Sequence, residues 1–132
     1  MCDTSALLHL TEAEALPLLS RMGEVSVPRA VDLEMTQHSP LWQSEKPPWI
    51  QVHSLTASAL REATAWRQAG LLDAGEAEAI ALARHMKAQW LLTDDAAARL
   101  FAQSLGIEVH GSLVAGCRAV GGRGWRTQPC RS

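Results

Sequence analysis

The pattern of hydrophobic and polar positions predicts strands and helices that alternate along most of the chain. Apolar residues in short alternating or continuous runs indicate strands at 24–27, 49–55, 89–93 and 107–111. Longer segments with helical spacing lie around them, at 3–10, 11–22, 29–37, 56–68, 72–86, 94–106 and 112–120. This alternation favours an α/β fold with a mostly parallel sheet.

Capping residues and apolar spacing predict the ends and faces of these helices. Thr11 and Glu14 have the spacing of a capping box, and Asp73 is a candidate cap for the helix at 72–86. That helix is expected to bury one face, formed by Leu72, Ala79, Ile80, Ala83 and Met86. Residues 38–48 have the polar and proline-rich composition of an irregular surface loop.

Length and composition predict one domain, residues 1–120, followed by a glycine- and arginine-rich tail at 121–132. No run reaches about 18 uncharged apolar residues, so we expect no membrane span. The first residues lack a basic segment, so we expect no signal peptide. Three cysteines without zinc-ligand spacing indicate free thiols in a reducing cytoplasm.

The net charge of −2 conceals an uneven distribution along the chain. Residues 1–108 carry 8 basic and 14 acidic side chains, a balance of −6, whereas the segment after Glu108 carries +4. A protein that binds duplex nucleic acid usually has a broad basic face, which this pattern does not indicate. A role with nucleic acid would therefore require a metal ion or a partner to neutralise the acids.

Acidic residues at strand ends and helix starts form the candidate site. In parallel α/β folds, ligands bind outside the carboxyl ends of strands, near the point where the strand order reverses. The candidates are Asp3, Glu34, Glu76, Glu78, Asp94 and Asp95. Each alone has a structural explanation, as a helix cap, as an acid near a helix N-terminus, or as a solvated helix residue. Together they would suit Mg²⁺ or Mn²⁺, which bind carboxylates and lower the pKa of a bound water.

Other chemistries lack support in the sequence. The five histidines are scattered without a zinc-ligand pattern, and no P-loop or dinucleotide-binding glycine motif occurs. Ser5 lacks the context of a hydrolase nucleophile, and Cys117 is typical of a small core residue. A phosphoacceptor receiver domain would have an acidic pair at its first strand and a lysine late in the chain. Here the pair comes late, and Lys87 precedes its strand.

Three segments resemble the PIN domain, the PilT N-terminus type of ribonuclease domain, and its compact prokaryotic branch near the VapC toxins. They are DTSALLHL at 3–10, EVSVPRAVDLEM at 24–35, and LLDAGEAEAIALARHMKAQWLLTDDAAARLFAQSLGIEVHGSL at 71–113. The last segment is the most specific, because its helix start, strand, double aspartate and second short strand occur in order. The resemblance implies a three-layer α/β/α sandwich with a mostly parallel central sheet.

The resemblance also implies a metal site with an activated water that hydrolyses RNA phosphodiester bonds, with Mg²⁺ or Mn²⁺ as cofactor. Its acids would be Asp3, Glu34, Glu76, Asp94 and Asp95. Asp95 lies two residues after Thr93, a spacing found in many PIN domains, whereas Asp94 completes the doublet of this branch. Glu78 is an alternative to Glu76 as the acid that the helix at 72–86 contributes to this site. Thr4 or Ser5 would hydrogen-bond the metal-bound water or a ligand.

Two functions are therefore expected. The first is a metal-dependent ribonuclease that acts as the toxin of a toxin–antitoxin pair, binds an antitoxin protein and forms a homodimer. The second is a catalytically weak PIN-like module that binds a protein or RNA partner. Only Met1 and Cys2 precede Asp3, so the first strand is expected to be short, with few ladder hydrogen bonds and a loosely held Asp3. This feature and the unusual tail favour the second function.

Overall fold

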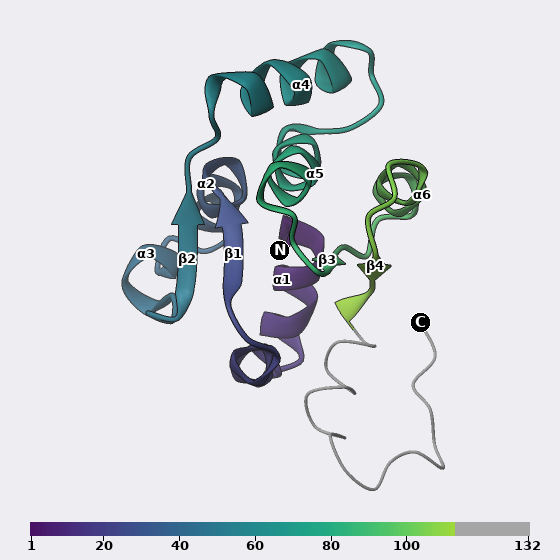
Figure 1. Ribbon diagram of the computed structural model, residues 1–132. Coiled ribbons are helices and arrows are strands. Elements are labelled where there is room, and N and C mark those ends of the chain that lie inside the picture. Colours follow the sequence, from purple (N-terminus) through teal and green to yellow (C-terminus); the bar gives the residue numbers. More distant parts are fainter. Residues whose placement is uncertain (113–132) are drawn as a thin grey trace, which may run out of the picture.

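The structure, a computed structural model, describes residues 1–112 as helices arranged around two pairs of parallel strands (Figure 1). The strands are β1 (Val25–Pro28), β2 (Ile50–His53), β3 (Leu91–Leu92) and β4 (Val109–His110). The helices are α1 (Thr4–Glu12), the 3₁₀ helix η1 (Leu16–Met22), α2 (Arg29–His38), α3 (Trp42–Glu45), α4 (Ala57–Gln68), α5 (Ala74–Met86) and α6 (Ala96–Ser104). β1 pairs with β2 and β3 pairs with β4, both in parallel, which confirms the predicted α/β class.

The N-terminal segment joins the two strand pairs into one row. The Cys2 amide donates to the Ser26 carbonyl oxygen of β1 over 3.1 Å, and the Asp3 amide donates to the Leu92 carbonyl oxygen of β3 over 3.0 Å. The Leu92 amide in turn donates to the first carbonyl oxygen of the chain over 2.8 Å. The row therefore runs β2, β1, the N-terminal segment, β3, β4, with the N-terminus between β1 and β3 in Figure 1. The expectation of a loosely held first strand is wrong, because this short segment is hydrogen-bonded on both sides.

The strand order reverses at this central segment. The chain first moves outward on one side to β1 and β2, and it then crosses to β3 and β4 on the other side. In parallel α/β sheets, the carboxyl ends of the strands that flank such a reversal are the usual place for a ligand. Here those ends carry Asp3 and the segment 93–95.

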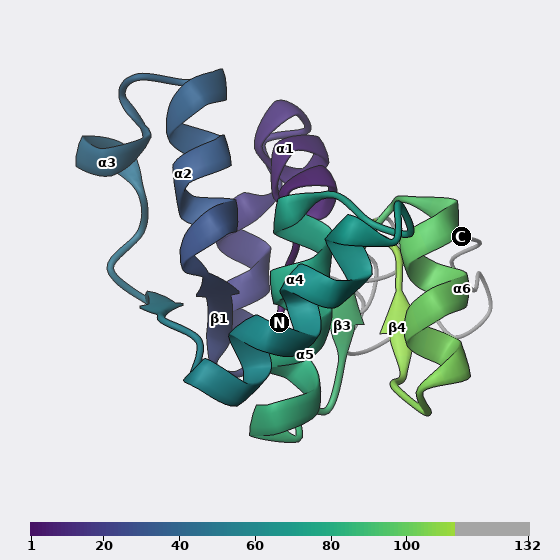
Figure 2. The ribbon, with the colours of Figure 1, turned by 90° about the horizontal axis from the view of Figure 1, so that it is seen from above.

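Two apolar clusters cover the opposite faces of this row. Met1 and Leu91 pack in the cluster beneath α4, α5 and α6, whereas Cys2 and Leu92 pack in the cluster formed with α1, η1 and α2. Neighbouring strand residues point to opposite faces, which explains this division. Figure 2 shows α1 next to α2, and α6 beside β4. The result is the three-layer α/β/α sandwich that the resemblance implied.

Helix α5 is buried on most of its surface, because it packs on the strands and lies beneath α4 (Figure 1). The predicted cap is confirmed: the Asp73 side chain accepts from the Glu76 amide over 2.9 Å, and the two residues form a capping box. The predicted apolar face is buried at Leu72, Ala79, Ile80 and Ala83. It is wrong at Met86, which is 44% exposed because it is the last residue of the helix.

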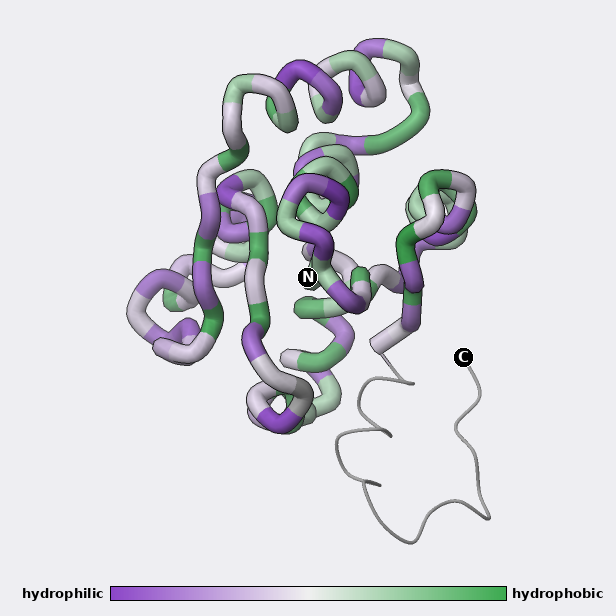
Figure 3. Tube along the Cα trace, viewed as in Figure 1, coloured by the Kyte–Doolittle hydropathy of each residue, from purple (hydrophilic) through white to green (hydrophobic). Residues whose placement is uncertain are grey.

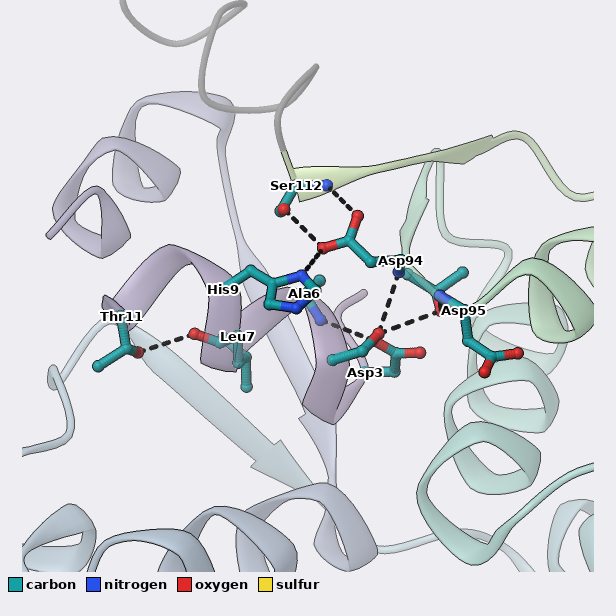
Figure 4. Close-up of polar contacts among 10 residues, drawn as sticks. Asp3, Ala6, Leu7, His9, Thr11, Asp94, Asp95 and Ser112 are labelled. Atoms are coloured by element: carbon teal, nitrogen blue, oxygen red, sulfur yellow. Dashed lines mark hydrogen bonds and ion pairs between the residues drawn. The ribbon is translucent and has the colours of Figure 1, made fainter. Parts of the chain in front are cut away.

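Two local expectations are wrong, the first because α1 extends through Thr11 and the second because α3 contacts another helix. Thr11 lies inside α1, where its hydroxyl donates to the Leu7 carbonyl oxygen over 2.8 Å, so it caps no new helix (Figure 4). The expected loop at 38–48 contains α3, which is tied to the buried carboxylate of Asp32 in α2. That carboxylate accepts from Trp42 Nε1 over 2.7 Å, Gln43 Nε2 over 2.9 Å and Lys46 Nζ over 3.0 Å.

Strands β1 and β2 differ in hydropathy (Figure 3) and in burial. Edge strand β2 alternates between apolar and polar residues and exposes Gln51 and Val52, whereas β1 is buried along its whole length.

Within residues 1–112, no helix combines the length and the apolar character needed to cross a membrane. Cys2 is a buried free thiol, as predicted. The other two cysteines, the helix predicted at 112–120 beyond its first residue and the tail at 121–132 lie outside the described residues.

Candidate functional site

A cavity of about 310 Å³ lies at the carboxyl ends of the central segment and β3. Its acidic lining residues are Asp3, Glu34, Asp73, Glu76 and Asp95. Its other lining residues are Thr4, Ser5, Leu8, Gln37 and His38. Helices α1 and α2 contribute one part of this lining, and the N-terminal ends of α5 and α6 contribute the other. The cavity therefore brings together acids from four segments that are far apart in the sequence.

Asp3 occupies the most buried position in the cavity lining. It caps α1, and its Oδ1 accepts from the Ala6 amide over 3.1 Å and from the Ser5 hydroxyl over 2.8 Å. Its Oδ2 is also buried but has no hydrogen-bond partner among residues 1–112. Burial raises the pKa of Asp3 to about 6, although the Thr93 side chain, the Ala6 amide and the Ser5 hydroxyl oppose the shift. A buried carboxylate oxygen without a donor is costly, so Oδ2 is well suited to a positively charged ligand.

A single hydroxyl connects the ends of the two central strands. The Asp94 amide donates to Ser5 Oγ over 3.0 Å, and Ser5 Oγ donates in turn to Asp3 Oδ1 (Figure 4). The next amide, that of Asp95, donates to Thr93 Oγ1 over 3.2 Å. Ser5 therefore occupies Oδ1 of Asp3 and leaves Oδ2 as the oxygen without a hydrogen-bond donor among the described residues.

Glu34 reaches the cavity from the middle of α2. The Thr4 hydroxyl at the start of α1 donates a hydrogen bond to its Oε1. Gly75, in the first turn of α5, makes room for this carboxylate, because a Cβ atom at position 75 would lie 2.1 Å from Glu34 Oε1. The glycine thus forms part of a cradle that a larger residue would fill.

The two rival glutamates of α5 have different surroundings. Glu76 lines the cavity, and burial together with the negative charges of Asp73, Asp95 and Asp3 raises its pKa to about 7. Glu78 is absent from the cavity lining, and its Oε1 accepts from the Ala30 amide at the start of α2 over 3.2 Å.

The two adjacent aspartates also differ. Asp95 lines the cavity and caps α6, where its Oδ1 accepts from the Ala98 amide over 2.9 Å. The carboxylate of Asp94 lies between α1 and the end of β4 (Figure 4). Its Oδ2 accepts from His9 Nδ1 and Ser112 Oγ, each over 2.6 Å, and its Oδ1 accepts from the Ser112 amide over 2.8 Å. Burial acts to raise the pKa of Asp94, but these hydrogen bonds outweigh burial and keep the pKa below its usual value.

The donor set of the cavity fits a hard divalent cation. Carboxylate oxygens are the ligands that Mg²⁺ and Mn²⁺ prefer, and Asp3 Oδ2 is one that has no competing donor in the described part of the chain. Within residues 1–112 as placed, no three acidic, imidazole or thiol side chains stand close enough to hold an ion together. A complete site would therefore require the acidic side chains, which repel one another in the absence of a cation, to move closer together.

Four lining residues were not among the predicted site residues: Leu8, Gln37, His38 and Asp73. The sequence could have predicted two of them, because residues four positions apart lie on the same face of a helix as a predicted site residue. Leu8 follows Thr4 by four positions in α1, and His38 follows Glu34 by four positions in α2. Asp73 was predicted only as a cap, a role that it also has.

A protein-family model described as a PIN domain matches residues 1–119. No curated protein and no solved structure gives a match. The family match spans most of the chain and includes every acid of the cavity. It agrees with the three-layer fold and with the position of the cavity at the strand-order reversal. The chain therefore belongs to the PIN-domain family, whose members are generally metal-dependent nucleases.

Proposed function

We propose that this protein is a Mg²⁺- or Mn²⁺-dependent ribonuclease that hydrolyses the phosphodiester bonds of RNA. The observation that carries the proposal is the convergence of Asp3, Glu76 and Asp95 on one cavity, where Asp3 Oδ2 has no hydrogen-bond partner within residues 1–112. Burial of mutually repelling carboxylates destabilises a fold unless a cation neutralises them. The nuclease character of the family supports the same conclusion.

In this proposal Asp3, Glu76 and Asp95 hold the cation, and Glu34 completes the acidic set from α2. A bound divalent cation supplies an activated water and stabilises negative charge on the phosphate. Ser5 positions Asp3 by donating to Oδ1, and Thr4 positions Glu34 by donating to Oε1. Thr93 accepts from the Asp95 amide and so helps to orient the start of α6. Asp94 and Glu78 lie outside the cavity lining and accept hydrogen bonds from segments distant in the sequence, so the proposal assigns them to the scaffold.

The decisive experiment compares isosteric variants of the cavity acids with a matched control. Asp3→Asn and Asp95→Asn retain a helix-capping oxygen, and Glu76→Gln retains the shape of the side chain. We expect each to lower Mn²⁺-stimulated cleavage of a fluorescent RNA by at least about 100-fold, because each removes an anionic ligand. Glu78→Gln should cleave like the wild type, since its Oε1 still accepts from Ala30. Unchanged cleavage in both aspartate variants would contradict the mechanism.

Calorimetric titration with Mn²⁺ separates the ribonuclease from a catalytically weak binding module. Saturable binding that is lost in Asp3→Asn supports the ribonuclease. A wild-type protein that binds RNA but neither binds Mn²⁺ nor cleaves supports the module instead.

The role as the toxin of a toxin–antitoxin pair rests on the resemblance of the double-aspartate segment to the branch near the VapC toxins. It predicts a small neighbouring gene for a DNA-binding antitoxin, and co-purification of its product with this chain. It also predicts a homodimer, which sedimentation of the purified protein can detect.

A further inference from the structure

One end of the cavity differs chemically from the rest. Four of the five acidic lining residues come from the central segment and from the N-terminal ends of α5 and α6. Helices α1 and α2 contribute Glu34, the hydroxyl residues Thr4 and Ser5, and also Leu8, Gln37 and His38. His38 is the only lining side chain within residues 1–112 that can carry a positive charge. An RNA strand that reaches the acids must place its other phosphates somewhere, and the acidic walls repel them.

Helix spacing relates these residues to the acids of the cavity. Thr4 and Leu8 lie one turn apart on α1, and Glu34 and His38 lie one turn apart on α2. Thr4 donates to Glu34, so the first turn of α1 faces the middle of α2. Leu8 and His38 therefore each lie one turn from this contact on their own helix, and both line the same cavity as the acids.

The polar groups at this end have no competing partners. Gln37 and His38 are exposed, and neither makes a hydrogen bond or ion pair within the part of the chain that the structure describes. The imidazole offers an N–H donor in either protonation state, and the amide offers two N–H donors. His38 also lies in the last turn of α2, where the helix dipole favours a cation.

We propose that Leu8, Gln37 and His38 form a nucleotide subsite that binds the phosphate next to the scissile one. His38 and Gln37 donate hydrogen bonds to the oxygens of that phosphate, and Leu8 provides an apolar contact for the attached nucleoside. This inference rests on the proposed function, because the scissile phosphate must lie at the acids. It adds that the preferred substrate is an oligonucleotide with at least one phosphate besides the one that is cleaved.

The test compares a long and a minimal substrate. A fluorescein-labelled oligoribonucleotide has flanking phosphates, whereas bis(4-nitrophenyl) phosphate has a single phosphodiester. We expect His38→Ala to raise KM for the oligoribonucleotide about tenfold with kcat changed less than about twofold, and to leave hydrolysis of the minimal substrate unchanged. His38→Gln, which keeps an N–H donor, should recover part of the loss. His85→Ala is the matched control, since His85 is an exposed histidine of α5 outside the cavity lining.

Two results would overturn the inference. One is an unchanged KM for the oligoribonucleotide in His38→Ala. The other is an equal loss on both substrates, which would assign His38 to the site of bond cleavage or to the structural support of that site.

Failure of the proposed function gives a different result. If the wild type cleaves neither substrate in Mn²⁺, the ribonuclease proposal fails, and fluorescence anisotropy of the same oligoribonucleotide then decides on the subsite. Binding by the wild type that is about tenfold tighter than by His38→Ala supports the subsite. Equal binding, or no binding by the wild type, overturns it.

Discussion

Carboxylates that line the cavity and carboxylates that tie the helices and strands together lie side by side in this sequence. Asp95 and Glu76 line the cavity, whereas Asp94 and Glu78, one and two positions away, do not. The second pair accepts hydrogen bonds from segments distant in sequence. The first pair accepts only from its own helix and faces the charges of other acids. Hydrogen-bond donors, rather than residue type, decide which group each acid belongs to.

This difference separates stability from function. An acid with complete hydrogen bonding stabilises the fold, because its charge is compensated in the folded state. An acid that faces other acids costs stability unless a cation binds, which is the arrangement expected of a binding group. Asp3 combines both situations, since its Oδ1 has two donors and its Oδ2 has none within residues 1–112.

The largest effect on stability is expected at Asp94. Asp94→Ala removes the acceptor for His9 Nδ1 and for both donors of Ser112, and it leaves the Ser112 amide without its partner. We expect the free energy of unfolding to fall by about 2 kcal/mol, measured by urea denaturation. Asp95→Asn, which keeps its capping oxygen, should change it by less than about 0.5 kcal/mol. Similar stability of the two variants would remove the distinction between the two aspartates.

A change of pH in a metal-free buffer is expected to have a smaller effect on the free energy of unfolding. The pKa values of Asp3 and Glu76 in the folded state are raised to about 6 and about 7, so the folded state binds protons more tightly than the unfolded state. The stabilisation is complete below about pH 4 and is lost as pH rises to about 7, so the free energy of unfolding should decrease from pH 5 to pH 8. Asp3→Asn should weaken this dependence, and saturating Mn²⁺ should oppose it. A stability that rises over this range would contradict the uncompensated repulsion in the cavity.

The smallest effect on stability, but a clear effect on metal binding, is expected at Gly75. Gly75→Ala places a methyl group where Glu34 Oε1 now lies, and the flexible carboxylate must move away. We expect Mn²⁺ affinity and cleavage to fall about tenfold. Stability should change by less than about 1 kcal/mol, because alanine favours the helix by a similar amount.

A double substitution controls for this effect. In a Glu34→Ala background the Cβ of position 75 no longer meets the carboxylate, so Gly75→Ala should cause no further loss of Mn²⁺ affinity. An equal loss in both backgrounds would assign the effect to α5 rather than to Glu34.

The sequence by itself determined the features that depend on local interactions. The alternation of strands and helices predicted the fold class, and the caps at Asp3 and Asp73 follow from hydrogen bonds within three residues. The same local reasoning was wrong at Thr11, because the spacing of a capping box also fits the interior of α1. It also missed α3, whose position depends on a carboxylate of another helix.

Only the tertiary structure decided the orientation of the acids. The position of Glu78 depends on the Ala30 amide, 48 positions away, and that of Asp94 depends on His9, 85 positions away. No local pattern encodes such donors, because packing of the layers brings them together. The inclusion of His38 in the cavity likewise required α1 and α2 to meet. The sequence supplied the acids and their caps, and the fold decided which carboxylates line the cavity and which accept hydrogen bonds from distant segments.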